Sequence, residues 1–147
     1  MNVTNELNLN FISKSTNESF ARAAVSAFLL FLDPTIAELA DIKTAVSEAV
    51  TNCIVHAYPN YIGTIYINVK VTDQNKIIIK IRDKGIGIKD VKQAIKPLFT
   101  TSKEERAGLG FAVMQSFMDN VKVRSKEGSG TTVIMEKTII RTNYDKR

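Results

Sequence analysis

Two adjacent segments near the middle of the chain alternate between apolar and polar residues. Residues 64–72 and 76–83 both carry Ile or Val at every second position. A period of two is typical of a strand with one buried face. Because the short polar stretch 73–75 joins the two segments, the sequence predicts a β-hairpin whose apolar face must be covered by other elements.

Helical patterns flank this hairpin. Apolar residues recur at spacings of three and four from Phe20 to Phe31, and a second apolar stripe runs through about 36–57, before Pro59 ends the helix. Among the other predicted elements are strands at about 6–12, 120–125 and 131–137 and helices at about 90–95 and 109–118. The pattern predicts an α+β fold with helices on one face of a mixed, largely antiparallel sheet.

The bulk composition limits the function. The chain has 147 residues, which is the size of one domain, and we expect a single domain over 1–147 with a frayed tail at 140–147. The net charge of +5 is scattered, so we expect a surface that tolerates a polyanionic ligand and no direct nucleic-acid binding. Cys53 is the one cysteine, which excludes an internal disulfide. Neither a secretory signal nor a membrane span is predicted, so we expect a cytoplasmic protein.

One polar stripe lies on the second predicted helix. Glu48, Asn52 and His56 are four residues apart and therefore share a face of that helix. An amide oxygen can ligate Mg²⁺ and a carboxylate can accept a proton, so the stripe suits oxygen chemistry. A plain solvent-facing stripe explains the same spacing, so the stripe alone decides little.

The end of the second hairpin strand carries an acid on the apolar face. Asp83 has the parity of the inward residues Ile79 and Ile81, and a buried carboxylate is costly unless hydrogen-bond donors surround it. Gly85 and Gly87 follow directly. A turn Asp that caps a glycine loop is one reading; an acceptor for an amino group such as that of adenine is the other, and the inward parity favours it.

A polar loop and a glycine pair precede the fourth predicted helix. Gly108 and Gly110 stand where that helix is predicted to open, and helix N-termini favour anions such as phosphate. The loop from Thr100 to Arg106 could close over such a ligand, although an ordinary surface loop fits as well. Thr131, at the start of the last strand, is the weakest of these signals.

The order of these motifs along the chain is more specific than any one of them. With the stretches 17–22, 32–35, 42–52, 97–101, 110–111 and 117–119, the chain resembles the GHKL ATPases, whose Bergerat fold is a two-layer α/β sandwich. Within that superfamily it resembles the bacterial anti-sigma serine kinases, most closely those of sporulation. The resemblance covers about residues 7–137.

The resemblance implies a role for each matching residue. It makes Glu48 the catalytic base, Asn52 the Mg²⁺ ligand, and Asp83 the adenine acceptor supported by Thr131. Arg106 would reach the γ-phosphate, and Arg22 would grip protein partners. The nucleotide-binding positions implied are Asn52, Asp83, Gly85, Gly87, Thr100, Thr101, Gly108, Gly110 and Thr131.

The implied function is a dual regulator. It would bind ATP or ADP with Mg²⁺, inhibit a sporulation sigma factor, phosphorylate a serine of an anti-anti-sigma protein, and form a homodimer. Three alternatives stay open: an anti-sigma kinase of the stress-response type, a nucleotide-gated binding module without kinase activity, and the catalytic domain of a histidine kinase. The last is disfavoured because His56 is the sole histidine and no helical hairpin with an acceptor His precedes the domain.

Overall fold

A five-stranded sheet forms one layer of the molecule. The computed structural model describes the backbone of residues 1–95 and 103–140 and the side chains of 1–95 and 109–140. The strands are β1 (Val3–Ile12), β2 (Thr64–Thr72), β3 (Lys76–Asp83), β4 (Asn120–Lys126) and β5 (Gly130–Thr138), and their spatial order is β1-β2-β3-β5-β4. Every described pairing is antiparallel, so the sheet is not mixed. The reason is that β5 lies between β3 and β4, which run in the same direction and would otherwise be parallel neighbours.

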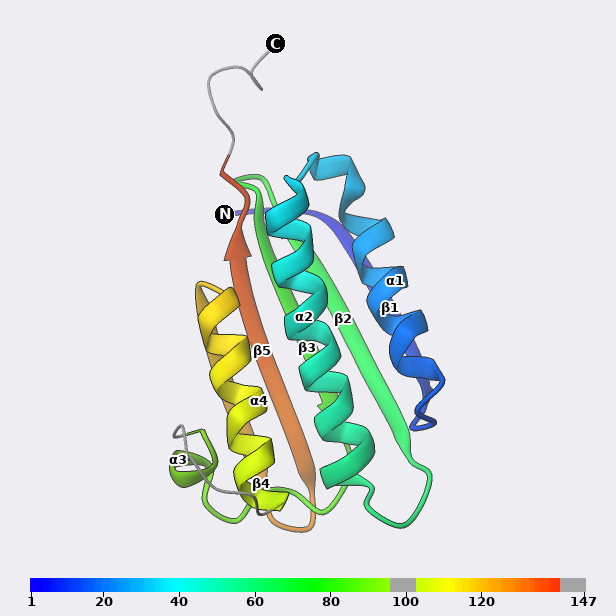
Figure 1. Ribbon diagram of the computed structural model, residues 1–147. Helices are drawn as coiled ribbons and strands as arrows, with labels where there is room; N and C mark the ends of the chain where they lie inside the picture. Colours follow the sequence, from blue (N-terminus) through cyan, green and yellow to red (C-terminus); the bar gives the residue numbers. More distant parts are fainter. Residues whose placement is uncertain (96–102, 141–147) are drawn as a thin grey trace.

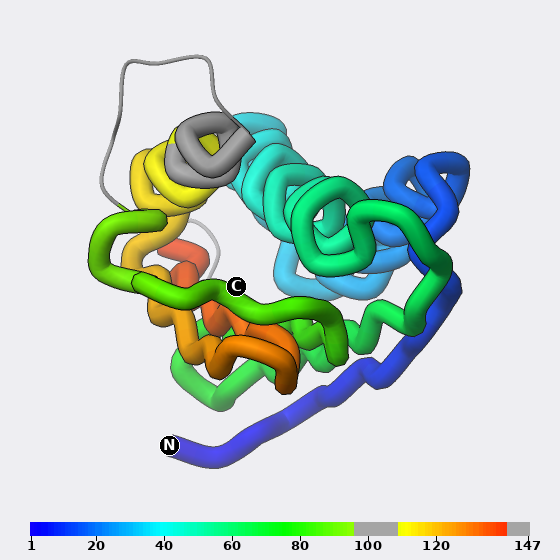
Figure 2. The backbone as a smooth tube through the Cα atoms, turned by 90° about the horizontal axis from the view of Figure 1, so that it is seen from below, coloured from blue at the N-terminus to red at the C-terminus, as the bar shows by residue number. Residues whose placement is uncertain are grey.

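Three long helices form the second layer and cover one face of the sheet, and a short fourth helix lies beside the last of these and β4 (Figures 1 and 2). The helices are α1 (Asn17–Leu29), α2 (Ile36–Asn52), α3 (Val91–Ala94) and α4 (Lys103–Phe117), with a 3₁₀ turn η1 (Leu30–Leu32) after α1 and a π-helical turn η2 (Cys53–Ala57) after α2. α2 lies between α1 and α4 and runs in the direction opposite to α4 (Figure 1). The C-terminal end of α2 and the N-terminal part of α4 therefore lie at the same end of the molecule. No described helix is long and apolar enough to span a membrane.

The core lies between the two layers, as the alternation in the hairpin predicts. Ile67 pairs with Ile81 across β2 and β3, and both side chains are buried beneath the helices. α2 contributes Ile42 and Val46, which are fully buried. A capping box fixes the start of α2, because Thr35 accepts from the Glu38 N–H while the Glu38 carboxylate accepts from the Thr35 N–H.

The helix predicted from Phe20 to Phe31 is present, but of its aromatic residues only Phe28 packs against the core, so the predicted apolar stripe is not the buried face. The side chains buried under α1 are Ala21, Val25 and Leu29, whereas Phe20 and Phe31 are each more than half exposed. Apolar residues occur on all sides of this helix. The spacing of the aromatic residues therefore marks the outer face of the helix and not the buried one. The consequence is an apolar outer surface on α1.

The start predicted for α4 is also wrong. The helix begins at Lys103 and not at Leu109, so Gly108 and Gly110 lie inside it. The residues from 103 to 107 include Lys, Glu, Arg and Ala, which are strong helix formers and can extend the helix toward its N-terminus. An N–H group inside a helix donates to the carbonyl four residues earlier, so this glycine pair is not an open helix terminus.

Candidate functional site

Asp83 ends β3 with its carboxylate pointing into the protein, as its parity predicts. The residue is only 4% exposed. Its Oδ1 accepts two backbone hydrogen bonds, from Gly85 N at 3.0 Å and from Thr131 N at 3.1 Å. Burial raises the pKa of the Asp83 carboxyl above its ordinary value, and these hydrogen bonds partly oppose the shift. The site therefore holds an acceptor whose second oxygen, Oδ2, has no backbone donor in the described residues.

The thiol of Cys53 joins the end of α2 to this carboxylate. Cys53 Sγ lies 3.5 Å from Asp83 Oδ2, and the thiol donates. Cys53 directly follows Asn52, so this contact brings the amide-bearing end of α2 to the end of β3. It is one of the contacts that join the two halves of the predicted site in the described part of the chain.

The loop after β3 passes so close to η2 that only glycine fits. A β-carbon at Gly85 would stand 2.2 Å from the carbonyl oxygen of Ala57, and the next residue, Ile86, donates its N–H to that same oxygen at 3.1 Å. Gly87 has a φ of +76°, which is a left-handed conformation that glycine adopts without strain. Both glycines therefore bring backbone, and not side chains, to the surroundings of Asp83.

Glu48 and Asn52 face α4 at Gly110. A β-carbon at Gly110 would stand 3.1 Å from Glu48 Oε2 and 3.3 Å from Asn52 Oδ1. Asn52 Nδ2 is buried and has no hydrogen-bond partner in the described part of the chain. An unpaired buried amide is costly, so the position fits a ligand with acceptor oxygens, such as a phosphate with its Mg²⁺. The side chains of Glu48 and Asn52 therefore fit both a phosphate and a Mg²⁺ ion.

Glu48 has an altered acidity. Burial, followed by the nearby charge of Glu18, raises the pKa of the Glu48 carboxyl above its ordinary value. A carboxylate with a raised pKa is a stronger proton acceptor, which suits a general base. His56 lies in η2, beyond Asn52 on the same stretch of chain.

Arg22 lies on α1 and reaches toward α2. Its Nη1 is 3.5 Å from Glu18 Oε1 and 3.3 Å from Ser47 Oγ, which precedes Glu48. It also lines a hollow of about 440 Å³ between α1 and α2 together with Ser26, Leu30, Leu39 and Lys43.

Four of the predicted site positions are described only in part or lie outside the described residues. Thr100 and Thr101 lie outside the described residues, and for Arg106 and Gly108 only the helical backbone of α4 is described. Their predicted contacts with phosphate stay predictions.

Sequence reasoning missed three residues that hold the site together. One is Cys53. Tyr58 accepts from Lys84 N at 2.6 Å and donates to Thr64 O at 2.7 Å, which fixes the chain just after Asp83. Ser125 accepts from Ile88 N at 2.7 Å and lies 2.7 Å from Thr131 Oγ1. Ser125 has the inward parity of Val121 and Val123 on β4. The period of two that places Asp83 inside the protein therefore also indicates an inward position for Ser125.

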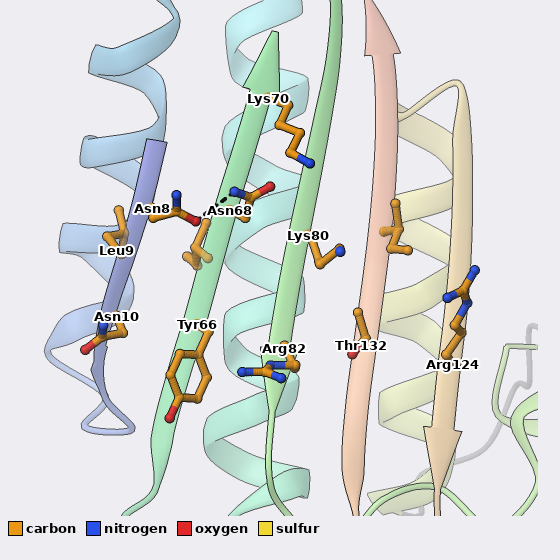
Figure 3. Close-up of a pocket in the computed structure, with 12 residues that line it drawn as sticks. Asn8, Leu9, Asn10, Tyr66, Asn68, Lys70, Lys80, Arg82, Arg124 and Thr132 are labelled. Carbon is orange, nitrogen blue, oxygen red and sulfur yellow. Dashed lines mark hydrogen bonds between the residues drawn. The ribbon is translucent and has the colours of Figure 1, made fainter. Parts of the chain in front are cut away.

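A second hollow lies away from this site, on the sheet face that none of the described helices covers (Figure 3). It has a volume of about 510 Å³ and is basic, with Lys70, Lys80, Arg82 and Arg124 among its lining residues. Arg82 also stacks over the ring of Tyr66 at 4.7 Å. Neither this hollow nor the one beside Arg22 contains Glu48, Asn52 or Asp83.

Comparison with known proteins defines the class to which this fold and site belong. Residues 13–137 match the family model of the histidine kinase-like ATPase domain, so the chain belongs to that ATP-binding family. The fold agrees: the RsbU and RsbW domains of Rv1364c from Mycobacterium tuberculosis superpose with a TM-score of 0.70 at 17% identity, over 95% of this chain and 34% of that one.

Closer relatives narrow the class. The chain is 60% identical over 142 residues to the anti-sigma F factor of Caldanaerobacter subterraneus subsp. tengcongensis, covering 96% of this chain and 99% of the relative. It is 59% identical to the anti-sigma F factor of Thermoanaerobacter sp. (strain X514), covering 95% and 97% of the two chains. The chain therefore belongs to the anti-sigma F factor family.

Proposed function

We propose that this chain is a cytoplasmic anti-sigma factor that binds and inhibits a sporulation sigma factor, and a serine kinase that inactivates the anti-anti-sigma antagonist with ATP. The observation that carries the proposal is that three side chains meet at one end of the molecule: the Asp83 carboxylate, which can accept from the amino group of adenine, and the acid–amide pair Glu48 and Asn52. Cys53 connects them through its contact with Asp83. The names of the two relatives above, anti-sigma F factor, support the anti-sigma part of the proposal.

The purine end of the nucleotide site is assigned to Asp83. Its Oδ2 would accept from the exocyclic amino group of adenine, while Thr131 N and Gly85 N hold Oδ1. Gly85 and Gly87 let the loop after β3 pack closely against the backbone of Ala57 and Lys126, and this loop would lie beside the ring. A 6-oxo purine such as guanine would present an acceptor to a carboxylate, so the site favours adenine.

The phosphate end is assigned to the side of α2 that faces α4. Asn52 would hold Mg²⁺ through its amide oxygen Oδ1, and its buried Nδ2, which lacks a partner in the described residues, would donate to a phosphate oxygen. Bound Mg²⁺ supplies charge neutralisation to the phosphate oxygens. Thr100, Thr101, Arg106, Gly108 and Gly110 remain the proposed phosphate-contacting positions, and a phosphate held by the two glycine N–H groups requires the first turns of α4 to unwind.

Glu48 is assigned as the base that orients and deprotonates the acceptor. The serine oxygen forms a bond to the γ-phosphorus, the bond from that phosphorus to the β–γ bridging oxygen breaks, and ADP leaves. The serine proton passes to Glu48, whose raised pKa suits this transfer. Phosphoryl transfer needs positioning and charge compensation more than covalent help from the protein. Glu48 would supply the positioning, and Asn52 with Mg²⁺ and Arg106 would supply the charge compensation.

The protein partners are assigned to the outer surface of α1 and α2. Arg22 and Lys43 give the hollow there a positive charge. The exposed Phe20 on α1, with Leu30 and Phe31 on η1, forms an apolar surface beside it. Such a combination fits a partner that presents acidic and apolar side chains together. We also propose a homodimer, for which the outer edge of β1 is free to pair in the described sheet.

Phosphate transfer from labelled ATP tests the proposal. The chain is mixed with [γ-³²P]ATP, Mg²⁺ and a purified anti-anti-sigma protein, and the labelled residue is identified by mass spectrometry. Label on a serine of the partner is expected. Label on His56 of this chain would indicate a histidine kinase, and absence of label with retained ATP and sigma-factor binding would indicate a nucleotide-gated binding module. Either result overturns the kinase assignment. Asp83→Asn, titrated with ADP and GDP, tests the adenine assignment separately.

A further inference from the structure

Cys53 occupies the point where α2 changes its helical geometry. It begins the π-helical turn η2, and its carbonyl accepts from Tyr58 N, five residues on, at 3.1 Å. π-helical turns occur often at functional sites, because the wider turn changes the direction of a side chain. Here the Cys53 thiol reaches the Asp83 carboxylate at the end of β3, and both residues are 4% exposed.

The two oxygens of Asp83 have different surroundings. Oδ1 accepts from the backbone N–H groups of Gly85 and Thr131, whereas Oδ2 accepts from the Cys53 thiol. Oδ2 is therefore the oxygen with capacity left for a ligand, since a carboxylate oxygen offers about two lone-pair sites. A single weak donor on Oδ2 fixes the carboxylate plane without filling that capacity.

The thiol keeps its proton in this position. The contact with Asp83 Oδ2 at 3.5 Å has the geometry of a thiol that donates to a carboxylate, so Cys53 acts as a hydrogen-bond donor and not as a thiolate. The hydrogen bond from Cys53 also lowers the pKa of Asp83, and so it partly offsets the increase that burial causes. The titratable neighbour on the other side is Tyr58, whose pKa burial also raises, so it stays neutral near pH 7.

We propose that Cys53 is a positioning residue for adenine recognition: its thiol orients Oδ2 of Asp83 toward the purine and favours the ionised carboxylate. The inference rests on the proposed nucleotide site and adds to it a specificity-determining residue. Cys53 acts through Asp83, so every effect of its removal on nucleotide affinity should require the Asp83 carboxylate.

A double-mutant cycle tests this coupling. ADP and GDP are titrated by calorimetry from pH 5 to pH 8 into the full chain and into Cys53→Ala, Cys53→Ser, Asp83→Asn and the Cys53→Ala/Asp83→Asn double variant. Cys53→Ala should weaken ADP binding about threefold to tenfold, the size expected for one hydrogen bond to a charged group, and leave GDP nearly unchanged. In wild-type protein, ADP affinity should fall at low pH as Asp83 becomes protonated, and we call this fall the acid limb. In Cys53→Ala the acid limb should move to higher pH, because the Asp83 carboxylate has lost a donor and takes up its proton more readily. Cys53→Ser should restore both properties, since its hydroxyl also donates.

The double variant separates positioning from packing. Cys53→Ala should have no further effect in the Asp83→Asn background. Equal effects in both backgrounds, or an acid limb that does not move, would overturn the role of Cys53. Val46→Ala, a buried change on α2, controls for lost packing and should leave the ADP-to-GDP ratio unchanged. If Cys53→Ala does not fold, Cys53→Val, which fills the space without donating, is read in the same way. If Asp83→Asn itself leaves ADP affinity intact, the adenine assignment fails independently of Cys53.

Discussion

Gly110 of α4 lies directly against Asn52 of α2, so that a β-carbon at position 110 would stand 3.3 Å from Asn52 Oδ1 and 3.1 Å from Glu48 Oε2. The two residues are 58 positions apart in the chain, and no pattern in the sequence links them. Their closeness means that the spacing between α2 and α4 at this end is set by a glycine. Any ligand between the acid–amide pair and α4 depends on that spacing.

Gly110→Ala is expected to weaken Mg·ATP binding while leaving the fold intact. The added methyl group crowds the Glu48 and Asn52 side chains, and alanine favours the helix by roughly 1 kcal/mol over glycine, which resists any unwinding of the first turns of α4. Calorimetric titration measures the affinity, and the melting temperature should stay equal or rise. Ser116→Ala, on the exposed side of the same helix, is the matched control. Unchanged ATP affinity in Gly110→Ala would remove this position from the site.

Glu48→Gln is expected to retain ATP binding and to lose phosphate transfer. The amide keeps the shape of the side chain but cannot accept the serine proton, and loss of a general base costs roughly 10²- to 10⁴-fold in rate. Single-turnover transfer to the anti-anti-sigma protein measures the loss. Glu38→Gln, in the capping box of the same helix, serves as the control and should transfer at the normal rate. A Glu48→Gln protein that transfers normally would exclude Glu48 as the base.

The buried charge of Asp83 makes stability depend on pH in a definite direction. The folded state raises the pKa of this carboxyl above its ordinary value of 3.8, so the folded protein binds its proton more tightly than the unfolded chain does. The resulting stabilisation is complete below the unfolded pKa and is lost as pH rises through the folded pKa.

Asp83→Asn removes this dependence because the amide does not titrate. Relative to the wild-type chain, the variant should gain free energy of unfolding as pH rises from about 3.8 through the folded pKa, and the difference should then level off. Urea unfolding of both proteins without nucleotide, over a series of pH values, measures the difference, in which the contributions of the other carboxyls largely cancel. If the difference in free energy of unfolding between the two proteins does not change with pH, the folded state does not raise the pKa of Asp83.

Arg22→Ala is expected to weaken sigma-factor binding without changing ATP affinity. Removal of an arginine at the centre of an interface costs about 2 kcal/mol or more, which is roughly thirtyfold in affinity. Its ion pair with Glu18 is partly exposed, so stability should change little. Binding is measured with the purified sigma factor in the presence of Mg·ATP. Lys80→Ala, in the basic hollow on the opposite sheet face, is the matched control, and an equal loss in both variants would place the partner elsewhere.

Local sequence patterns predicted the structure correctly in those elements of which one face is apolar and the other is polar. The alternation in 64–72 and 76–83 predicted β2 and β3 to the residue, because a period of two allows one register and one buried face. The same parity placed Asp83 inside the protein. The pattern failed in α1, where apolar residues lie on both faces, and at the start of α4, where good helix formers extend the helix beyond the glycines.

The sequence by itself determined the elements, the inward position of Asp83 and the family to which its motifs point, because these depend on spacing along one segment. Only the tertiary structure decided which segments meet: Cys53 with Asp83, Gly110 with Glu48 and Asn52, and Tyr58 with Lys84. Such contacts depend on the order of the strands and the packing of α2 between its neighbours. A solitary cysteine in an apolar stripe carries no sign of the carboxylate that the fold brings to its thiol.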